Sequence, residues 1–331
     1  MRALLKFTTL AALCLLPTIT HAACTGQDIR ADLTPGQRAE IAASVAAMPY
    51  AEGNHWRATR GDQTITLLGT MHLYDPRMQD IVDRLAPRIA QADLLMVEIT
   101  ETEEADLQRA IATDPTIAFL TEGPSLIDRT TPETWAVLAG AAQARGVPPF
   151  MAAKYQPWFL SLTLSLPVCA LADLRAGRTG LDKMVITTAK DAGVPVTALE
   201  THTELLRIFA ADTIDEQVRY LPMIAQMQKT AENATASTVA GYFEEKHGEL
   251  IAFSRVFSRD QVDFPPAEFE TLFDEMMAML LDQRNLAWMD RIDARDEDNI
   301  VIAVGAAHLG GATGLVNQLA ERGYTVERLP F

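Results

Sequence analysis

Two histidines, His72 and His308, have the type and position to take part in chemistry. Each follows an apolar, strand-like run, "LLGTMHL" (67–73) and "VIAVGAAHL" (301–309), and each comes three residues after a glycine, Gly69 or Gly305. Imidazole is the commonest transition-metal ligand near neutral pH. Glycine allows the backbone to turn sharply and to approach a ligand closely. The two GxxH motifs therefore predict a shared site at the ends of two neighbouring strands, with Thr70 as a supporting residue of the first motif.

Two glutamates occupy matching positions. Glu98 lies near the end of "LLMVEIT" (94–100), and Glu200 closes "VPVTALE" (194–200). A carboxylate at the end of a buried strand is costly unless it is paired or coordinated. Two imidazoles with two carboxylates form a donor set for a divalent ion such as manganese, cobalt or zinc. We therefore predict a metal site of His72, His308, Glu98 and Glu200.

We expect three further polar residues to lie near this predicted site. Three roles are open for Asp75: a helix cap, a metal ligand, or a hydrogen-bond acceptor for an imidazole. Of these we expect the helix cap. Arg284 and Asn285 lie within a long helical segment, where the arginine could neutralise a carboxylate or stabilise an oxyanion. His55 and His247 stand in polar surroundings and are expected at the surface. The chain has no GxSxG, P-loop or HExxH motif, which argues against serine hydrolases, nucleotide-binding P-loops and helix-borne zinc proteases.

The elements that would position these residues follow a strand–helix–strand plan. One unit covers about 55–100, with a hairpin at Gly61-Asp62 and a helix that Pro87 is expected to bend or divide. A second unit covers about 299–331, and 194–200 adds a further strand. About 101–290 has mostly helical spacing. We predict an α/β fold with a duplicated strand–GxxH–helix–strand core sheet and a large, mostly helical insertion, all within a domain at 55–331.

The amino-terminal region has a different character. Residues 1–23 combine a basic start, an apolar core and small residues, which predicts a secretory signal cleaved after Ala22 or Ala23. Residues 24–54 form a helical lead-in. Cys24 and Cys169 then remain as a pair that could form a disulfide in an oxidising compartment, with lipidation of Cys24 as the alternative. We predict a secreted, periplasmic or extracellular protein without a membrane span in the mature chain.

The overall charge bears on partners. The 331 residues carry a formal net charge of -16. Such an acidic chain disfavours nucleic acid as a partner. The expected partner is a peptide or another small substrate.

These motifs, in this order and spacing, resemble the TraB/GumN family over about residues 55 to 330. The family includes TraB and PrgY proteins, is related to the animal Tiki proteases, and resembles the erythromycin esterase and ChaN proteins. The resemblance matches the two GxxH motifs, Glu98, the "LET" at 199–201 and the "RN" at 284–285. It implies a duplicated α/β core and, from the Tiki branch, metal-dependent proteolysis with manganese or cobalt.

The residues and the resemblance together predict a secreted, metal-dependent hydrolase, in particular a peptidase. The metal would activate water, Glu98 or Glu200 would act as general base, and Arg284 would stabilise the oxyanion, with Asn285 among the catalytic residues. The alternative is a non-catalytic protein that sequesters a peptide signal, a metal or haem. A third interpretation makes His72 and His308 hydrogen-bonded core residues.

Overall fold

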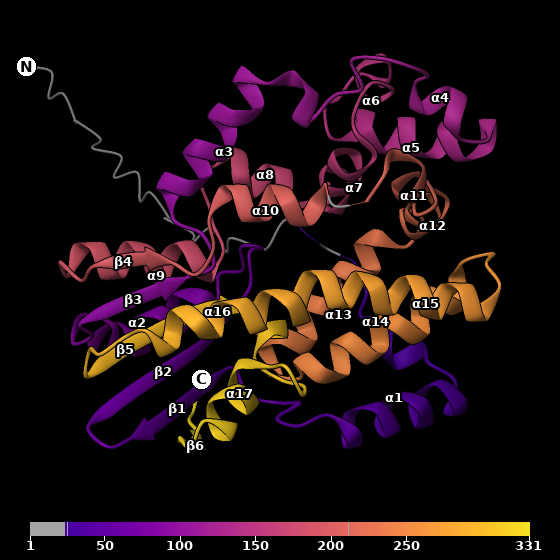
Figure 1. The fold of residues 1–331 in the computed structure, drawn as a ribbon. Helices are drawn as coiled ribbons and strands as arrows, with labels where there is room; N and C mark the ends of the chain where they lie inside the picture. Colours follow the sequence, from indigo (N-terminus) through magenta and orange to yellow (C-terminus); the bar gives the residue numbers. More distant parts are fainter. Residues whose placement is uncertain (1–23, 25, 211) are drawn as a thin grey trace, which may run out of the picture.

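The computed structural model describes residues 24, 26–210 and 212–331 (Figure 1). The predicted signal segment, 1–23, lies outside the described residues. Within the described part of the chain, no helix is both long and apolar enough to cross a membrane.

A mixed six-stranded sheet forms the centre of the fold. Its order is β4-β3-β5-β2-β1-β6. The strands are β1 (His55–Arg60), β2 (Gln63–Thr70), β3 (Leu94–Val97), β4 (Val196–Ala198), β5 (Asn299–Gly305) and β6 (Thr325–Arg328). Strands β4, β3, β5 and β2 run parallel, whereas β1 runs antiparallel to both β2 and β6. The predicted α/β fold class is therefore confirmed, as is the hairpin at Gly61, which joins β1 to β2.

The position of β5 was not predicted. A strand–helix–strand unit, such as the one predicted at about 55–100, implies that its two strands pair in parallel. Instead β5, from the far end of the chain, lies between β2 and β3 and pairs with both. The two strand–helix–strand units thus interleave in one sheet. Strand β4 returns to pair with β3, as expected for the run at 194–200.

Helices cover both faces of the sheet (Figure 1). On one face, α2 (Met78–Ala90) and α9 (Leu181–Asp191) pack on side chains such as Leu68 and Leu95. On the other, α16 (Gln283–Asp293) and α17 (Leu315–Glu321) pack on Ile65 and Ile302. Burial of both faces explains why the strands read as nearly continuous apolar runs. Helix α2 is not divided at Pro87, because its apolar stripe holds it on the sheet on both sides of the proline.

The predicted helical insertion connects β3 to β4 and β4 to β5, and part of it has its own apolar core around Leu138, Leu160 and Leu221. A π-helical turn, η3 (Ala278–Asp282), joins α15 to α16. The remaining helices of the insertion are α3 (Glu101–Thr113), η2 (Pro115–Ile117), α4 (Leu126–Arg129), α5 (Pro132–Ala144), α6 (Pro149–Ala152), α7 (Pro157–Ser165), α8 (Ala170–Arg175), α10 (His202–Phe209), α11 (Ile214–Val218), α12 (Leu221–Met227), α13 (Ala231–Phe243), α14 (His247–Gln261) and α15 (Pro266–Met277). A short 3-10 helix, η4 (Ala306–His308), follows β5.

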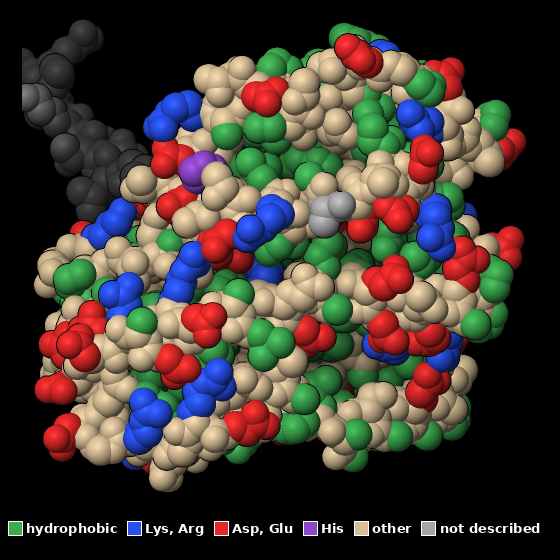
Figure 2. Space-filling view, viewed as in Figure 1, with side chains coloured by type: hydrophobic (Ala, Val, Ile, Leu, Met, Phe, Trp, Pro, Cys, Tyr) green, Lys and Arg blue, Asp and Glu red, His purple; other side chains and the backbone are tan. Residues whose placement is uncertain are grey.

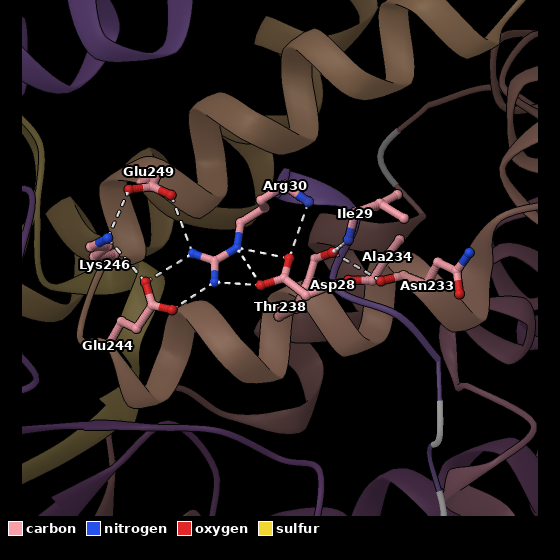
Figure 3. A network of polar contacts seen from close by, with 10 residues as sticks. Asp28, Ile29, Arg30, Asn233, Ala234, Thr238, Glu244, Lys246 and Glu249 are labelled. Atoms are coloured by element: carbon pink, nitrogen blue, oxygen red, sulfur yellow. Dashed lines mark hydrogen bonds and ion pairs between the residues drawn. The ribbon is translucent and has the colours of Figure 1, made fainter. Parts of the chain in front are cut away.

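The amino-terminal segment, which contains η1 (Ile29–Asp32) and α1 (Pro35–Ala47), is fastened to the helical layer at several points. Cys24 forms a disulfide with Cys169, with 4.8 Å between the two Cα atoms. A cysteine in a disulfide has no thiol left for a lipid. Figure 3 shows Arg30 bonded to Asp28, Glu244 and Glu249, which ties η1 to α13 and α14.

Two histidines expected at the surface are buried instead. His55 is 5% exposed and its Nδ1 lies 2.6 Å from the carbonyl oxygen of Pro330. His247 is 3% exposed and its Nε2 donates to the carbonyl of Tyr50. In both cases a segment distant in sequence covers the ring, so the polar local sequence was a poor guide.

The surface carries charges of both signs. On the face drawn in Figure 2, described lysines and arginines are interleaved with acidic side chains, and hydrophobic side chains gather over the upper, helical part.

Candidate functional site

Four predicted polar residues follow the carboxyl ends of four adjacent parallel strands. Across the sheet edge, Glu200, Glu98, His308 and His72 follow β4, β3, β5 and β2. The two GxxH motifs are in register, because Thr70 on β2 pairs with Gly305 on β5. Parallel strands end at the same edge, which is where ligands collect in open α/β sheets.

Arg284 connects the two glutamates. Its Nη2 donates to Glu98 Oε2 at 2.7 Å and also to Glu200 Oε1, and its Nε lies 3.1 Å from both Glu200 oxygens. The side chains of Arg284, Glu98 and Glu200 are only 11%, 14% and 4% exposed. Arg284 is placed by α16, directly after the π-helical turn, and its Nη1 donates to the carbonyl of Leu280 in that turn. One guanidinium thus serves two buried carboxylates.

The two carboxyl groups differ in their electrostatic surroundings. Burial opposes ionisation of Glu98, but His308, which is protonated only at low pH, Arg284 and His72 attract its carboxylate, and the Gly305 N–H donates to it, so its pKa falls to about 2. Burial raises the pKa of Glu200 above the ordinary value, and the bonds from Arg284 and Trp288 offset this only in part. Glu98 therefore holds its charge more firmly than Glu200 does.

His308 is held by Asn285. Its Nδ1 lies 2.7 Å from Asn285 Oδ1, and Asn285 Nδ2 donates to the His308 carbonyl at 3.3 Å. An amide oxygen can only accept, so Nδ1 carries the proton and Nε2 is an acceptor, which receives a hydrogen bond from Arg284 Nη1. That Nε2 lies 3.9 Å from Glu98 Oε1 and 3.3 Å from Arg284 Nη1. Burial lowers the pKa of His308 to about 4, so the ring is neutral near pH 7. Asn285, predicted as catalytic, is 1% exposed and positions His308.

His72 lies at the mouth of a cavity of about 240 Å³. The side chain of His72 is 68% exposed, and its Nδ1 lies 3.2 Å from Asp182 Oδ2. The hydrogen bond to Asp182 raises the pKa of His72. The cavity is lined by Thr70, His72, Val97, Glu98, Ile99, Glu104, Asp182, Ile186, Glu200, Leu205, Phe209, Arg284 and Ala303. It therefore brings His72 together with both glutamates and Arg284, whereas His308 is not among its lining residues.

The motif glycines allow close packing between loops. A Cβ on Gly69 would lie 2.9 Å from Leu309 Cδ1 and 3.1 Å from Ala306 Cβ. A Cβ on Gly305 would lie 3.3 Å from Glu98 Oε1. Gly69 thus lets the first GxxH strand approach the second GxxH loop, and Gly305 lets the backbone approach a site carboxylate.

The two other supporting residues have different surroundings. Thr70 is 2% exposed and lines the cavity, and its Oγ1 has no hydrogen-bond partner. Asp75 accepts from the Arg77 backbone N–H at 3.0 Å and from its guanidinium, just before α2. Asp75 thus forms a local turn ahead of the helix. The helix cap that the sequence favoured for Asp75 is wrong, because the N-cap of α2 is Arg77 and the structure has no side-chain cap there.

Two other polar features lie elsewhere. A larger cavity of about 350 Å³, lined in part by Thr66, Arg84 and Arg88, contains none of the predicted site residues. Glu103, Asp106 and His202 place potential ligand atoms within 4.8 Å of one another. This group is hydrogen-bonded internally, and Arg109 pairs with Asp106, so we assign it no role.

Sequence reasoning missed two residues of the site. Asp182 occupies the first turn of α9, where an acid is ordinary, so only its contact with His72 distinguishes it. Trp288 packs its ring 4.5 Å from the ring of His308, centroid to centroid, and donates to Glu200. Its spacing of four from Arg284 on one helix was the available signal.

Comparison with known proteins gives two relatives and one family. Over 283 residues the chain is 25% identical to the uncharacterized protein YbaP of Escherichia coli (strain K12), covering 81% of this chain and 94% of that protein. It is 24% identical to the uncharacterized protein YbaP of Shigella flexneri over the same length and the same shares. The model of the TraB/PrgY/gumN family matches residues 54–328, which include all four strand-end residues. The chain therefore belongs to the TraB/PrgY/gumN family.

Proposed function

We propose that this protein is a metal-dependent hydrolase, in particular a peptidase, whose divalent ion is held by His72, His308 and Glu98. The observation that carries the proposal is that both GxxH histidines are held at Nδ1 by a neighbouring side chain. Each has its Nδ1 within hydrogen-bond distance of a side-chain oxygen, from Asp182 or Asn285. This leaves Nε2 of His72 for a ligand, whereas Nε2 of His308 accepts from Arg284 Nη1 and would bind an ion once that arginine shifts. Metal-binding histidines are typically held in this way.

Two of the three donor atoms, from His308 and Glu98, are in place for such an ion. Among the described residues, His72, His308 and Glu98 do not form a group whose ligand atoms all lie within 4.8 Å of one another, so the exposed His72 side chain would turn inward to complete the site. His308 Nε2 and Glu98 Oε1 are 3.9 Å apart, within the span of two bonds of about 2.0–2.2 Å each. Glu98 and Glu200 bring two negative charges against the single positive charge of Arg284, so the cluster retains a negative charge that favours a cation. Manganese, cobalt and zinc all match this mixed nitrogen and oxygen set.

The contrast between the glutamates supports a division of roles. Glu98, with a pKa of about 2, suits a ligand that stays ionised. Glu200, with a raised pKa, suits a general base that takes a proton from water. The bound ion would polarise the scissile carbonyl and make that water more acidic. Arg284, which faces the cavity, would stabilise the oxyanion once Glu200 is protonated and needs it less.

A non-catalytic binding protein is the second candidate, and one observation favours it. Arg284 bonds to both glutamates, so their charges are already paired without a metal ion, as in an ion cluster that serves only to stabilise the fold. In that case the cavity captures a peptide, a metal ion or haem without turnover.

One set of measurements separates the two candidates. Purified protein is stripped with chelator, titrated with manganese, cobalt and zinc, and tested on a peptide library with each ion and with EDTA. We expect Glu98→Gln to lose ion binding, and Glu200→Gln to bind the ion but lose turnover. Glu204→Gln is the matched control, because Glu204 pairs with Arg291 and does not line the cavity.

The outcomes are distinct. Ion binding without turnover in the wild type supports the binding protein. An absence of ion binding in a folded wild type refutes the metal site in both forms.

We also propose that the protein is exported to the periplasm or the cell exterior. The Cys24–Cys169 disulfide supports this, since such bonds persist in oxidising compartments. Amino-terminal sequencing of protein from the periplasm or medium should begin at about residue 23 or 24.

A further inference from the structure

Asp182 contacts His72 from a neighbouring element. It lies in the first turn of α9, its side chain is 20% exposed, and it lines the same cavity as Glu98 and Glu200. Its Oδ2 is 3.2 Å from His72 Nδ1. Its other oxygen, Oδ1, is buried without a hydrogen-bond partner. A first-turn acid is ordinary because it meets the positive end of the helix dipole, but that interaction does not require a buried oxygen without a donor, which costs stability. Helix stability therefore accounts for Asp182 only in part.

The backbone fixes Asp182 relative to His72. The Leu181 N–H donates to the carbonyl of Met71 at 3.0 Å. Gly180, just before α9, is packed so tightly that a Cβ would lie 2.2 Å from Met71 O and 2.4 Å from the carbonyl carbon of His72. Asp182 is therefore placed beside the imidazole by main-chain contacts that do not depend on its own side chain.

The second GxxH motif offers an internal comparison. Asn285 Oδ1 lies 2.7 Å from His308 Nδ1 and comes from α16, on the opposite face of the sheet from α9. His308 is buried and is held by a neutral amide, whereas His72 is exposed and is held by a carboxylate. A charged acceptor makes the stronger hydrogen bond, which an exposed and otherwise mobile imidazole requires.

We propose that Asp182 is the positioning residue of the first GxxH motif. It holds the Nδ1 side of His72 and presents Nε2 to the cavity, as Asn285 does for His308. This inference rests on the proposed metal site, because the bound ion is the ligand that Nε2 of His72 would hold. Without Asp182, the His72 side chain would sample other rotamers and bind an ion less tightly.

The test compares Asp182→Ala, Asp182→Asn and the control Asp191→Asn, an exposed aspartate at the last position of the same helix. Ion affinity is measured by competition with a chelator, and the ¹⁵N shifts of the His72 ring are recorded without metal at one fixed pH. Thermal unfolding checks that each variant folds.

We expect Asp182→Ala to weaken ion binding about 10–100-fold and to move the ¹⁵N shifts of His72. Asp182→Asn should recover part of both effects, because its amide oxygen still accepts from Nδ1. Asp191→Asn should match the wild type. A folded Asp182→Ala protein with wild-type affinity and unchanged His72 shifts would overturn the inference. If the wild type binds no ion, the proposed function fails, and the metal-free spectra still decide whether Asp182 holds His72.

Discussion

Replacing Arg284 by methionine removes a guanidinium that bonds to two buried carboxylates. Breaking a buried ion pair by deleting one partner costs about 3–5 kcal/mol, because the other charge stays buried without compensation. Arg284, Glu98 and Glu200 are each less than 15% exposed, so solvent cannot replace the lost bonds. For a chain of this size, such a loss lowers Tm by roughly 6–10 °C, at about 2 °C per kcal/mol.

The stability that Arg284→Met loses relative to the wild type should be larger at high pH than at low pH. In the wild type the lowered pKa of Glu98 stabilises the fold above the unfolded carboxyl pKa of 4.5, and this contribution is lost as pH falls toward about 2. In Arg284→Met both buried carboxyl groups should have raised pKa values, so the variant loses stability as pH rises. The stability gap between the two proteins should therefore be wider at pH 8 than at pH 5.

The assay is urea unfolding of both proteins in EDTA at pH 5 and pH 8. The control is Arg291→Met on the same helix. Its partner Glu204 and its own side chain are each about a third exposed, and it also donates to the Leu199 carbonyl, so the expected cost is about 1–2 kcal/mol. If the unfolding free energy of Arg284→Met stays within about 1 kcal/mol of the wild-type value at pH 8, the buried ion pairs of Arg284 contribute far less to stability than expected.

Two other perturbations test separate parts of the fold. The Cys24→Ser, Cys169→Ser double variant should lose about 2–5 kcal/mol, toward the upper end because the bond closes a loop with a sequence separation of 145, and an unchanged urea midpoint would contradict this. His247 is buried and its pKa is lowered, so the unfolded chain takes up its proton first and stability falls as pH drops below about 6.5. Replacing it in His247→Gln should reduce the loss between pH 6.5 and 5.5 by up to about 1.4 kcal/mol, and an unchanged slope in urea unfolding would argue against a buried neutral ring.

The strand ends were predictable because the signal is local. An apolar run indicates a buried strand, and a glycine or a glutamate at its end, such as Gly69 or Glu98, indicates where that strand stops. The same holds for Glu200 and for the second GxxH motif. Arg284 was recognised as a cation that could meet a carboxylate, but its two partners were not identified.

The features that were missed depend on contacts between distant segments. The insertion of β5 between β2 and β3 joins residues more than 200 positions apart, and no local pattern records it. His247 is covered by the loop that contains Tyr50, and His55 by the carboxyl-terminal segment. Asp182 reads as an ordinary first-turn acid until the fold brings it beside His72.

The central place of β5 has a consequence for biosynthesis. Until residues 299–305 have been made, β2 and β3 each lack the neighbour that both of them pair with, and His308 is absent from the cluster. A nascent chain can assemble its helical layer early, but its sheet closes only when the last segment arrives. Such long-range closure makes folding slow and leaves strand edges open while translation continues. The order of synthesis thus delays formation of the cluster until the polypeptide is nearly complete.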